Sequence, residues 1–564
     1  MQHKIKFLLQ LILKNFSIIL TFFFGVGLIL AVFGFNFSQI PGDLGDTRFN
    51  LYILEHFFQW LQNPGTNYWQ ANFFYPFPLT MAFSDNLLGS APIYAVFRLF
   101  GVSRESAYQG WYLIGFILNF IAAAYVLQKL EIKPFASGFG AFFFAFGLPM
   151  LVQEGHPQLI YRFCVPFASY FLWKFANSPN LKSILIVFVM VVWQFYLTIY
   201  IGFFLVLLLL FMLLIIPFFC QKINIQNLLL FWPKRLLQAW QITQPKGKLV
   251  FLIGFVAFCG LFFGLIYPYY QVSKLYPFTR SLYEITSMLP RWQSYFLADH
   301  SLLWKPISKT ISSLPMRHEH QLFPGIAVSL LIILGIFIRK NSSYKPFVII
   351  NLIALILLLL FTMWFNGFSL YTLLIKIPGF NSIRAVTRIQ LVLMWPLAVV
   401  TSFILNRLMD NKSFLQKLFS IGVMILLFFE ALTFSHYRFS KYDSQMRISN
   451  LRDEIRNSVD IQEGSIIYIG SDPTVPWYVS EIDAMFAALE LGIPTLNGYS
   501  GSLLYGAGIK TECGEIPYRI ISYMQFSEIS DKNYYRNTIN RVIPWNVDNC
   551  APQWLDDFPL GISP

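Results

Sequence analysis

Two aspartates just behind the first long apolar run carry the clearest sign of chemistry in this sequence. The run is followed by IPGDLGDTRFN, in which Asp43 and Asp46 each directly follow a glycine. A turn in which Asp46 caps a helix starting near Thr47 would need only one acid. Arg48 and Glu55 follow closely, and Arg48 is a further candidate substrate ligand. A partly desolvated carboxylate at a membrane boundary is suited to accept a proton from a hydroxyl group. We therefore expect at least one of the two aspartates to act as a base.

Arginines near the ends of two apolar runs are candidate ligands for an anion. Arg384 and Arg388 are four residues apart in PGFNSIRAVTRIQ, so a helix there would present both on one face. A guanidinium group can bind phosphate through two parallel hydrogen bonds. Arg162, which opens another apolar run, is a third candidate. The alternative for such residues is snorkelling of a long side chain to the membrane surface.

Two loop segments hold further candidate substrate ligands. His156 and Gln158 lie in GHPQ between two apolar runs, although a lone loop histidine is more often structural. Asp85 follows Ser84 in AFSDNLLG, where the pair resembles the N-cap of a helix at 87–100. That capping role explains Asp85 adequately, and a catalytic role is the alternative.

Two short motifs add polar groups late in the chain. In His318-Glu319-His320 the spacing does not let a helix or strand aim all three side chains at one ion. Glu319 contacting a sugar or an arginine is an equal alternative to a metal site. Asn497 and Tyr499 lie in NGYSG, which first of all predicts a turn, and both could also hydrogen-bond or stack on a glycan.

Composition shows which elements must position these residues. Of the 564 residues 56% are hydrophobic and 12% are charged, with a mean hydropathy of +0.56, whereas soluble domains carry about 25% charged residues. The formal net charge of +13 comes from basic residues scattered between apolar runs, which argues against nucleic-acid binding. The pattern is typical of a polytopic membrane protein whose first run is a retained signal anchor.

The apolar runs predict about eleven membrane-spanning helices. They lie at about 16–37, 107–128, 135–152, 158–175, 182–199, 201–220, 249–270, 323–338, 346–365, 389–406 and 417–435. The run at 87–100 is short and contains Pro92 and Arg98, so we expect it to lie in the interface.

The charge bias fixes the predicted orientation. With the N-terminus inside, the cytoplasmic pieces hold 18 of the 41 Lys and Arg, against only Glu131 and Asp410 as acids, as the positive-inside rule requires. The opposite face then carries the outer loops 38–106 and 271–322, which belong to a membrane domain at 1–435. It also carries residues 436–564, which predict a small α/β domain from a polar helix (MRISNLRDEIRNSVD), a strand (SIIYIG) and turns. Cys513 and Cys550 lie in that domain, where a disulfide and two free thiols are both open.

The motifs together resemble the GT-C superfamily of integral-membrane glycosyltransferases, in an uncharacterised bacterial branch. The resemblance covers essentially the whole chain. It is specific for the superfamily and weak for the substrate. The matching stretches are Gly42 to Asn50, Tyr75 to Gly89, Gly155 to Gln158, Glu319 to Gly325, Pro378 to Arg384 and Asn497 to Gly501.

This resemblance implies an inverting transferase of the bacterial inner membrane. The donor would be a polyprenyl-phosphate sugar, and the acceptor a glycan, a lipid or a protein on the periplasmic side. The base would fall on Asp43 or Asp46, with a divalent metal ion as an optional helper. A transporter or flippase of lipid-linked saccharides is the main alternative, but it predicts mid-membrane charges and internal repeats, which the sequence shows little of.

Overall fold

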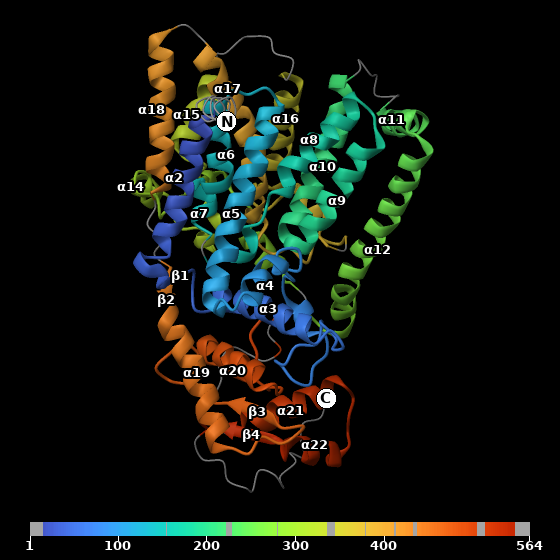
Figure 1. Cartoon of the computed structure of the whole chain (residues 1–564), viewed down its shortest axis with the longest axis vertical. Coiled ribbons are helices and arrows are strands. Elements are labelled where there is room, and N and C mark those ends of the chain that lie inside the picture. The colour runs from blue at the N-terminus through green and yellow to red at the C-terminus, as the bar shows by residue number, and fades with distance from the viewer. Residues whose placement is uncertain are drawn as a thin grey trace, which may run out of the picture. The chain divides into compact units, whose positions relative to one another are not determined.

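The computed structural model describes residues 15–153, 155–220, 228–278, 280–335, 345–377, 379–410, 413–432, 437–502, 504 and 514–547. The chain is mainly helical (Figure 1). It divides into two compact units, and two of the boundaries between them fall inside helices α5 (Arg104–Lys129) and α12 (Pro245–Leu275). Unit 1 comprises Met1–Gly34, Gly110–Leu265 and Thr279–His436, and unit 2 comprises Phe35–Gln109, Ile266–Phe278 and Tyr437–Pro564. The first predicted outer loop thus groups with the C-terminal segment.

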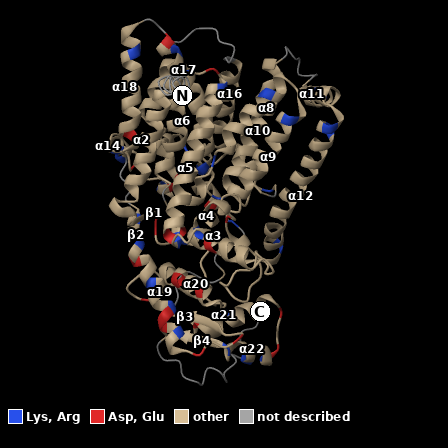
Figure 2. Ribbon diagram, in the orientation of Figure 1, with Lys and Arg blue, Asp and Glu red and all other residues tan. Residues whose placement is uncertain are grey.

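Unit 1 is a bundle of apolar helices around α17 (Gln390–Asp410). Helix α17 contacts α6 (Pro134–Phe146), α16 (Lys345–Thr362), α15 (Ile326–Gly335) and α18 (Phe414–Ala431). Most of its apolar window is buried, as expected for a helix that is hydrophobic all round. Charged residues of unit 1 gather mainly at helix ends, and the helix middles are largely uncharged (Figure 2). The remaining helices are α2 (Phe16–Val32), α7 (Leu148–Leu151), α8 (Cys164–Asn177), α9 (Leu181–Leu197), α10 (Ile199–Cys220), α11 (Leu228–Ile242), α13 (Leu282–Ser287) and α14 (Lys305–Thr310).

Each of the eleven predicted spans overlaps a helix in the part of the chain that the structure describes. In the described part of the chain, six helices are long and apolar enough to cross a membrane. Four further apolar helices are shorter, for example Phe16–Val32 and Leu181–Leu197. The multi-pass character is therefore supported by six spans, and the total of eleven stays a prediction.

Unit 2 combines short strands with helices from both ends of the sequence. Strand β1 (Gln39–Pro41) pairs antiparallel with β2 (Arg438–Ser440), and β3 (Ile466–Ile469) pairs parallel with β4 (Val542–Trp545). The helices are α3 (Asp46–Gln62), α4 (Ala91–Leu99), α19 (Lys441–Ser458), α20 (Trp477–Leu491), α21 (Glu515–Phe526) and α22 (Lys532–Ile539). The predicted polar helix and the strand SIIYIG are confirmed as α19 and β3.

Strand β3 is buried on both faces, which explains its unbroken apolar sequence. Ile466 and Tyr468 pack into one cluster with residues of α21 and α22. Ile467 and Ile469 point the other way and pack against α19 and α20. The alternation follows from the two-residue period of a strand, so this strand forms the centre of the C-terminal part of unit 2.

The short interfacial helix begins later than its sequence suggests. Helix α4 starts at Ala91 after Ser90, with Pro92 in its first turn, where a proline loses no helical hydrogen bond. Leu87 has a φ of +53°, which interrupts any helix from 87 onward. The prediction that Ser84 and Asp85 cap this helix is therefore wrong.

Gly325, the last residue of the motif EHQLFPG noted above as Glu319 to Gly325, makes room for a buried acid. Glu430 of α18 is 2% exposed and accepts hydrogen bonds from the first backbone N–H groups of α15, at Ile326 and, at 3.1 Å, at Ala327. Gly325 has a φ of +105°, and a Cβ there would lie 2.8 Å from a carboxylate oxygen of Glu430. Any side chain at this position would strain the backbone and displace the capping acid.

We expect Gly325→Ala to lower the free energy of unfolding more than Gly367→Ala does. Gly367 has nearly the same φ, +106°, but open space at its Cβ. Gly367→Ala should cost backbone strain alone, about 1–3 kcal/mol. Gly325→Ala should add about 1 kcal/mol or more for the disturbed hydrogen bonds of Glu430. Denaturation midpoints of the purified protein in detergent test this, and equal losses in the two variants would contradict it.

Candidate functional site

The motifs picked out in the sequence gather in two places, one in each unit. In unit 2, the turn before α3 meets the NGYSG segment, and we name this group the Asp46–Tyr499 cluster (Asp43, Asp46, Thr47, Tyr499). In unit 1, the GHPQ loop meets the HEH segment and the start of α17, and we name this group the Arg388–Glu319 cluster (His156, Tyr200, Glu319, Arg388).

The capping role in the first cluster belongs to Asp43. Its Oδ1 accepts hydrogen bonds from the backbone N–H groups of Gly45 (3.2 Å) and Thr47 (3.0 Å). In return the backbone N–H of Asp43 donates to the Thr47 hydroxyl at 3.1 Å. This reciprocal arrangement is a capping box displaced by one residue. The prediction that Asp46 caps the helix is wrong, because the helix already begins at Asp46.

Asp46 instead receives a hydrogen bond from the other end of the chain. The Tyr499 hydroxyl donates to Asp46 Oδ1 at 2.7 Å. Burial and the neighbouring charge of Asp46 raise the pKa of Tyr499 above its usual range, so the phenol stays a donor. Gly45 packs closely against two tyrosines, since a Cβ there would lie 3.3 Å from the Tyr499 hydroxyl and 3.4 Å from the Tyr478 ring. The carboxylate of Asp46 is therefore held in a fixed position at the start of α3.

Buried polar groups fix the backbone that carries Tyr499. The Asn497 amide accepts from the N–H of Ile469 at 2.8 Å and donates to its carbonyl at 2.9 Å, so its side chain extends the pairing of β3. Glu481 accepts from the N–H of Gly498, and Arg519 donates to the Leu496 carbonyl at 2.9 Å. Asn497 thus has a structural part in the described structure, with its amide engaged by the strand.

Glu481 and Arg519 form an ion pair at 2.9 Å, with side chains 1% and 2% exposed. Neither residue was expected from the sequence. Glu481 lies in α20 with the sequence WYVSEIDAMFAALEL, and an acid on a helix whose other face is apolar was the available signal. This pair positions the Tyr499 segment through its hydrogen bonds to the backbone of Gly498 and Leu496.

Arg48 lies in a buried network away from solvent. It is 1% exposed and pairs with Asp483, which also pairs with Arg447. Burial lowers the pKa of Arg48, and the attraction of Asp483 acts in the opposite direction. This geometry ties α3 to α20 and gives no support to the predicted substrate contact of Arg48.

The segment around Asp85 lies beside the Tyr499 segment. The Ser84 hydroxyl accepts a hydrogen bond from the N–H of Gly501 at 3.2 Å, and the Ser84 carbonyl accepts from the Tyr269 hydroxyl at 2.8 Å. Asp85 itself is partly buried. The motifs Tyr75 to Gly89 and Asn497 to Gly501 are therefore neighbours in space.

The Arg388–Glu319 cluster is centred on a buried ion pair. Arg388 donates to Glu319 through Nη2 at 2.8 Å and Nε at 3.3 Å, and both side chains are about 5% exposed. Nε2 of His156 lies 3.1 Å from Arg388 Nη2 and 3.5 Å from Glu319 Oε1, and the guanidinium lies over the Tyr200 ring. Burial opposes ionisation of Glu319, but Arg388 and His156 outweigh it and hold its pKa well below the usual range. Glu319 was expected either in a metal site or in contact with a sugar or an arginine, and the structure shows the arginine contact. Gln158 lies nearby in the sequence, in the short 3-10 helix Pro157–Leu159.

Arg384 does not share a helix face with Arg388. Residues 381–385 are not helical, and Arg388 lies in a short 3-10 helix, Val386–Ile389, that precedes α17. Arg384 lies 3.3 Å from Glu284, and Arg280 lies 3.3 Å from the same carboxylate oxygen. The prediction of one helical face is wrong, and the charge of Arg388 is neutralised by Glu319. Both arginine side chains are partly exposed. Arg280 and Glu284 carried no motif in the sequence.

Arg162 is fully buried and its side chain holds backbone segments together. Nη2 donates to the Phe144 carbonyl at 2.9 Å, and Nη1 donates to the Leu391 carbonyl at 3.1 Å. With no exposed surface, the guanidinium has a packing role in the described structure. It gives no support to the predicted phosphate contact of Arg162.

The HEH motif does not form a metal site in the part of the chain that the structure describes, which holds no group of three or more His, Cys, Asp or Glu that could bind an ion. His320 Nδ1 lies 2.7 Å from the Ser294 hydroxyl and its Nε2 lies 2.9 Å from the Ser287 carbonyl. Cys513 and Cys550 lie outside the described residues. Cys164, Cys220 and Cys259 are free thiols.

We expect the stability of unit 1 to fall between about pH 6.5 and pH 4 because of His320. Burial lowers the pKa of His320 from 6.5 to about 4. Between these values the unfolded chain binds a proton that the folded chain does not, so stability rises with pH. The full shift corresponds to about 3 kcal/mol. Denaturation midpoints between pH 7 and pH 4 should show a weaker slope for His320→Asn. His318→Asn, at an exposed neighbouring position, is the control and should keep the slope of stability against pH. An unchanged slope of stability against pH in His320→Asn would contradict the assignment.

Comparisons with known proteins give the following results. No family model matches the chain, and no curated protein matches it. Among solved structures it is similar to the oligosaccharyltransferase of Archaeoglobus fulgidus in the apo form, with 13% identity, a TM-score of 0.46, and coverage of 86% of this chain and 65% of that chain. It is also similar to the archaeal oligosaccharyltransferase AglB from Archaeoglobus fulgidus in complex with an inhibitory peptide and a dolichol-phosphate, with 14% identity, a TM-score of 0.39, and coverage of 85% and 68%.

Both TM-scores lie below 0.5, so these likenesses do not establish a shared fold. The chain spans less than two thirds of the length of the first of the two proteins. The described structure therefore defines a class, a helical multi-pass membrane protein with polar clusters in each of its units.

Proposed function

We propose that this protein is a membrane glycosyltransferase of the GT-C type. It would move a sugar from a polyprenyl-phosphate donor to a glycan, lipid or protein acceptor on the periplasmic side of the bacterial inner membrane. The observation that carries the proposal is the carboxylate of Asp46 at the start of α3, oriented by the hydroxyl of Tyr499 at 2.7 Å. A carboxylate that is positioned in this way is what general base catalysis on a hydroxyl group requires.

The choice of Asp46 over Asp43 rests on their hydrogen bonds. Asp43 Oδ1 is engaged by two backbone N–H groups, which commits its carboxylate to capping α3. Asp46 would take the proton of the acceptor hydroxyl while that oxygen forms a bond to the anomeric carbon. The bond from the anomeric carbon to the phosphate oxygen breaks, and the lipid phosphate leaves with the electron pair, which gives inversion at that carbon.

The departing lipid phosphate needs cations held in place. Arg280 and Arg384 both contact the carboxylate of Glu284 and are 28% and 39% exposed. Both guanidinium groups are thus accessible to an anion. Arg388 is neutralised by Glu319, and its part would be to position the segment that carries Arg384.

The proposal is tested by reconstitution of the full chain in liposomes with polyprenyl-phosphate sugars that carry a radiolabel. Transfer of label to a glycan, lipid or peptide acceptor is the expected result. Arg384→Gln and Arg280→Gln should each raise the KM for donor about tenfold, as expected for loss of one charge-assisted hydrogen bond. The control is Lys376→Gln, which removes an exposed positive charge nearby. Movement of intact donor across the bilayer without transfer would overturn the proposal in favour of a flippase.

A further inference from the structure

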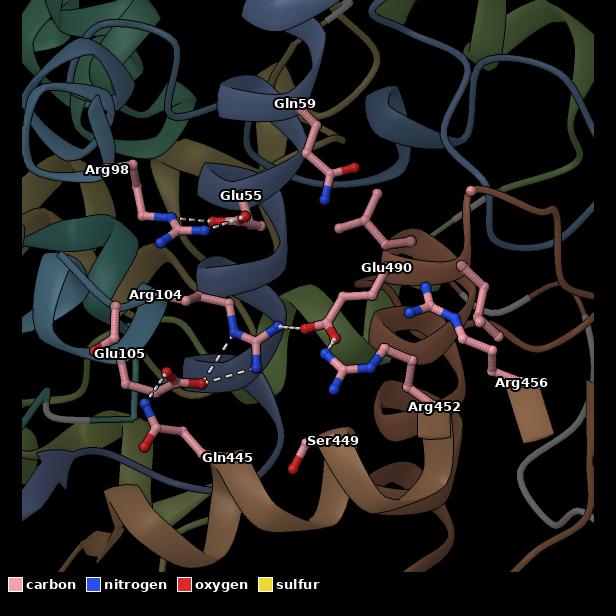
Figure 3. A pocket seen from close by; sticks show the side chains of 14 residues that line it. Glu55, Gln59, Arg98, Arg104, Glu105, Gln445, Ser449, Arg452, Arg456 and Glu490 are labelled. Atoms are coloured by element: carbon pink, nitrogen blue, oxygen red, sulfur yellow. Dashed lines mark hydrogen bonds and ion pairs between the residues drawn. The ribbon is translucent and has the colours of Figure 1, made fainter. Parts of the chain in front are cut away.

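Unit 2 contains a cavity of about 700 Å³ that the proposed reaction does not use. Its walls come from the ends of α3 and α4, the first turn of α5, one side of α19 and the last turn of α20 (Figure 3). Half of the fourteen residues that line it are charged, with four arginines and three glutamates. Volumes of this size are typical of sites for small ligands.

The cavity lies on the far side of α3 from Asp46. Glu55, which lines the cavity, follows Asp46 by nine residues on the same helix. Nine residues make two and a half turns of an α-helix, so the two side chains leave on opposite faces, about 13 Å apart along the axis. A ligand in this cavity would therefore not occupy the position of the acceptor hydroxyl at Asp46.

The acids that line the cavity are already occupied by arginines. Glu490 accepts from Arg104 at 2.6 Å and from Arg452 at 2.8 Å. Glu55 accepts from both Nε and Nη2 of Arg98 at 3.0 Å. Glu105 likewise pairs with Arg104 and accepts from the amide of Gln445 (Figure 3). These carboxylates therefore have little capacity left for the hydroxyl groups of a ligand.

Donors, in contrast, remain in excess. A guanidinium group has five N–H donors, and Arg452 spends three of its nitrogen positions on Asp453 and Glu490. Arg456 is exposed, and among the described residues it attracts Asp453 electrostatically without a hydrogen bond or close ion pair to it. The amide of Gln59 adds further donors on the opposite wall (Figure 3). A cavity with spare donors and one exposed cation whose N–H groups are not engaged by a described carboxylate favours a ligand that is rich in acceptors and negatively charged.

We propose that this cavity binds a saccharide that carries an oxyanion, either a phosphate or a carboxylate. The oxyanion is held by Arg456 and by the spare donors of Arg452. The sugar hydroxyls meet Gln59 and Ser449, and the apolar face of the ring rests on Leu489 and Leu491. This inference goes beyond the proposed transfer reaction and is measured as binding without turnover.

The experiment uses the full chain, purified in detergent and titrated by calorimetry. The probes are glucose 6-phosphate, glucuronate, neutral glucose and inorganic phosphate. The first two distinguish a phosphate from a carboxylate, and at least one should bind at a single saturable site at least tenfold more tightly than glucose or inorganic phosphate. Arg456→Gln should weaken that binding at least tenfold, because charge-assisted hydrogen bonds are the strong ones. Arg536→Gln provides the control, since Arg536 is an exposed arginine of α22 in the same unit.

Three results would overturn the inference. Glucose binding as tightly as both charged sugars would remove the anion from the proposal, and inorganic phosphate binding equally well would remove the saccharide. Equal affinities in Arg456→Gln and Arg536→Gln would place the ligand elsewhere. Gln59→Ala gives a second variant, for which we expect weaker binding. Asp46→Asn should bind the charged sugars normally. Binding to the cavity can therefore be judged even if the transferase proposal fails.

Discussion

Replacing Asp46 by asparagine is expected to lower the rate of sugar transfer about 10²–10⁴-fold, the usual contribution of a general base. An asparagine oxygen can still accept the hydrogen bond that Tyr499 donates to Asp46 at 2.7 Å. The variant should therefore keep its fold and its affinity for donor while losing the ability to take up a proton. Initial rates with the labelled donor, together with denaturation midpoints, measure the two effects separately.

Asp43→Asn is the matched control for this prediction. Asp43 caps α3 through Gly45 and Thr47, and asparagine caps a helix about as well as aspartate does. We expect its transfer rate to change only a few-fold. A large loss in Asp43→Asn with little change in Asp46→Asn would exchange the two roles. Full activity in both variants would exclude a carboxylate base in this turn.

Arg519→Met is expected to lower the free energy of unfolding of unit 2 by about 3–5 kcal/mol, the usual cost of breaking a buried ion pair. It would leave Glu481, with a side chain 1% exposed, without its cation. The segment that carries Tyr499 would also lose the hydrogen bond from Arg519 to the Leu496 carbonyl. We therefore expect a loss of transfer activity together with the loss of stability.

A double variant separates these two effects. Glu481→Leu combined with Arg519→Met should regain most of the stability, because apolar side chains can replace a buried ion pair. Transfer should stay low, since the Leu496 carbonyl would still lack Arg519 and the N–H of Gly498 would also lose Glu481. Arg447→Met is the control, because Arg447 is 33% exposed and its partner Asp483 keeps Arg48. Similar losses of stability in Arg447→Met and Arg519→Met would contradict the assignment.

The apolar runs allowed the helices of unit 1 to be located from the sequence, because length and hydropathy are local properties. The strand β3 and the helix α19 could be predicted for the same reason. The helix predicted across Arg384 and Arg388 failed, since the described residues 381–385 are not helical. Its spacing was right for a helix, but the backbone there follows the ion pairs with Glu284 and Glu319.

Pairings between distant segments could not be predicted. Asp46 and Tyr499 were both expected to be functional, but nothing local indicates that residues 453 positions apart meet. The role of Asp43 was within reach, because Thr47 four residues later is suited to a reciprocal cap. The pair of Glu481 and Arg519 joins two helices of the C-terminal segment, and single-sequence patterns do not indicate which acid meets which base.

The antiparallel pairing of Gln39 with Ser440 has a consequence for biosynthesis. The segment that follows the first apolar helix obtains its strand partner only after some four hundred further residues have left the ribosome. At about 5–20 residues per second, the wait for the Tyr499 segment lasts roughly 20–90 s. During this interval the turn that holds Asp46 lacks its packing partner and is accessible to proteases and to non-native contacts. Chaperones that bind the nascent segment would therefore be expected to raise the yield of folded protein.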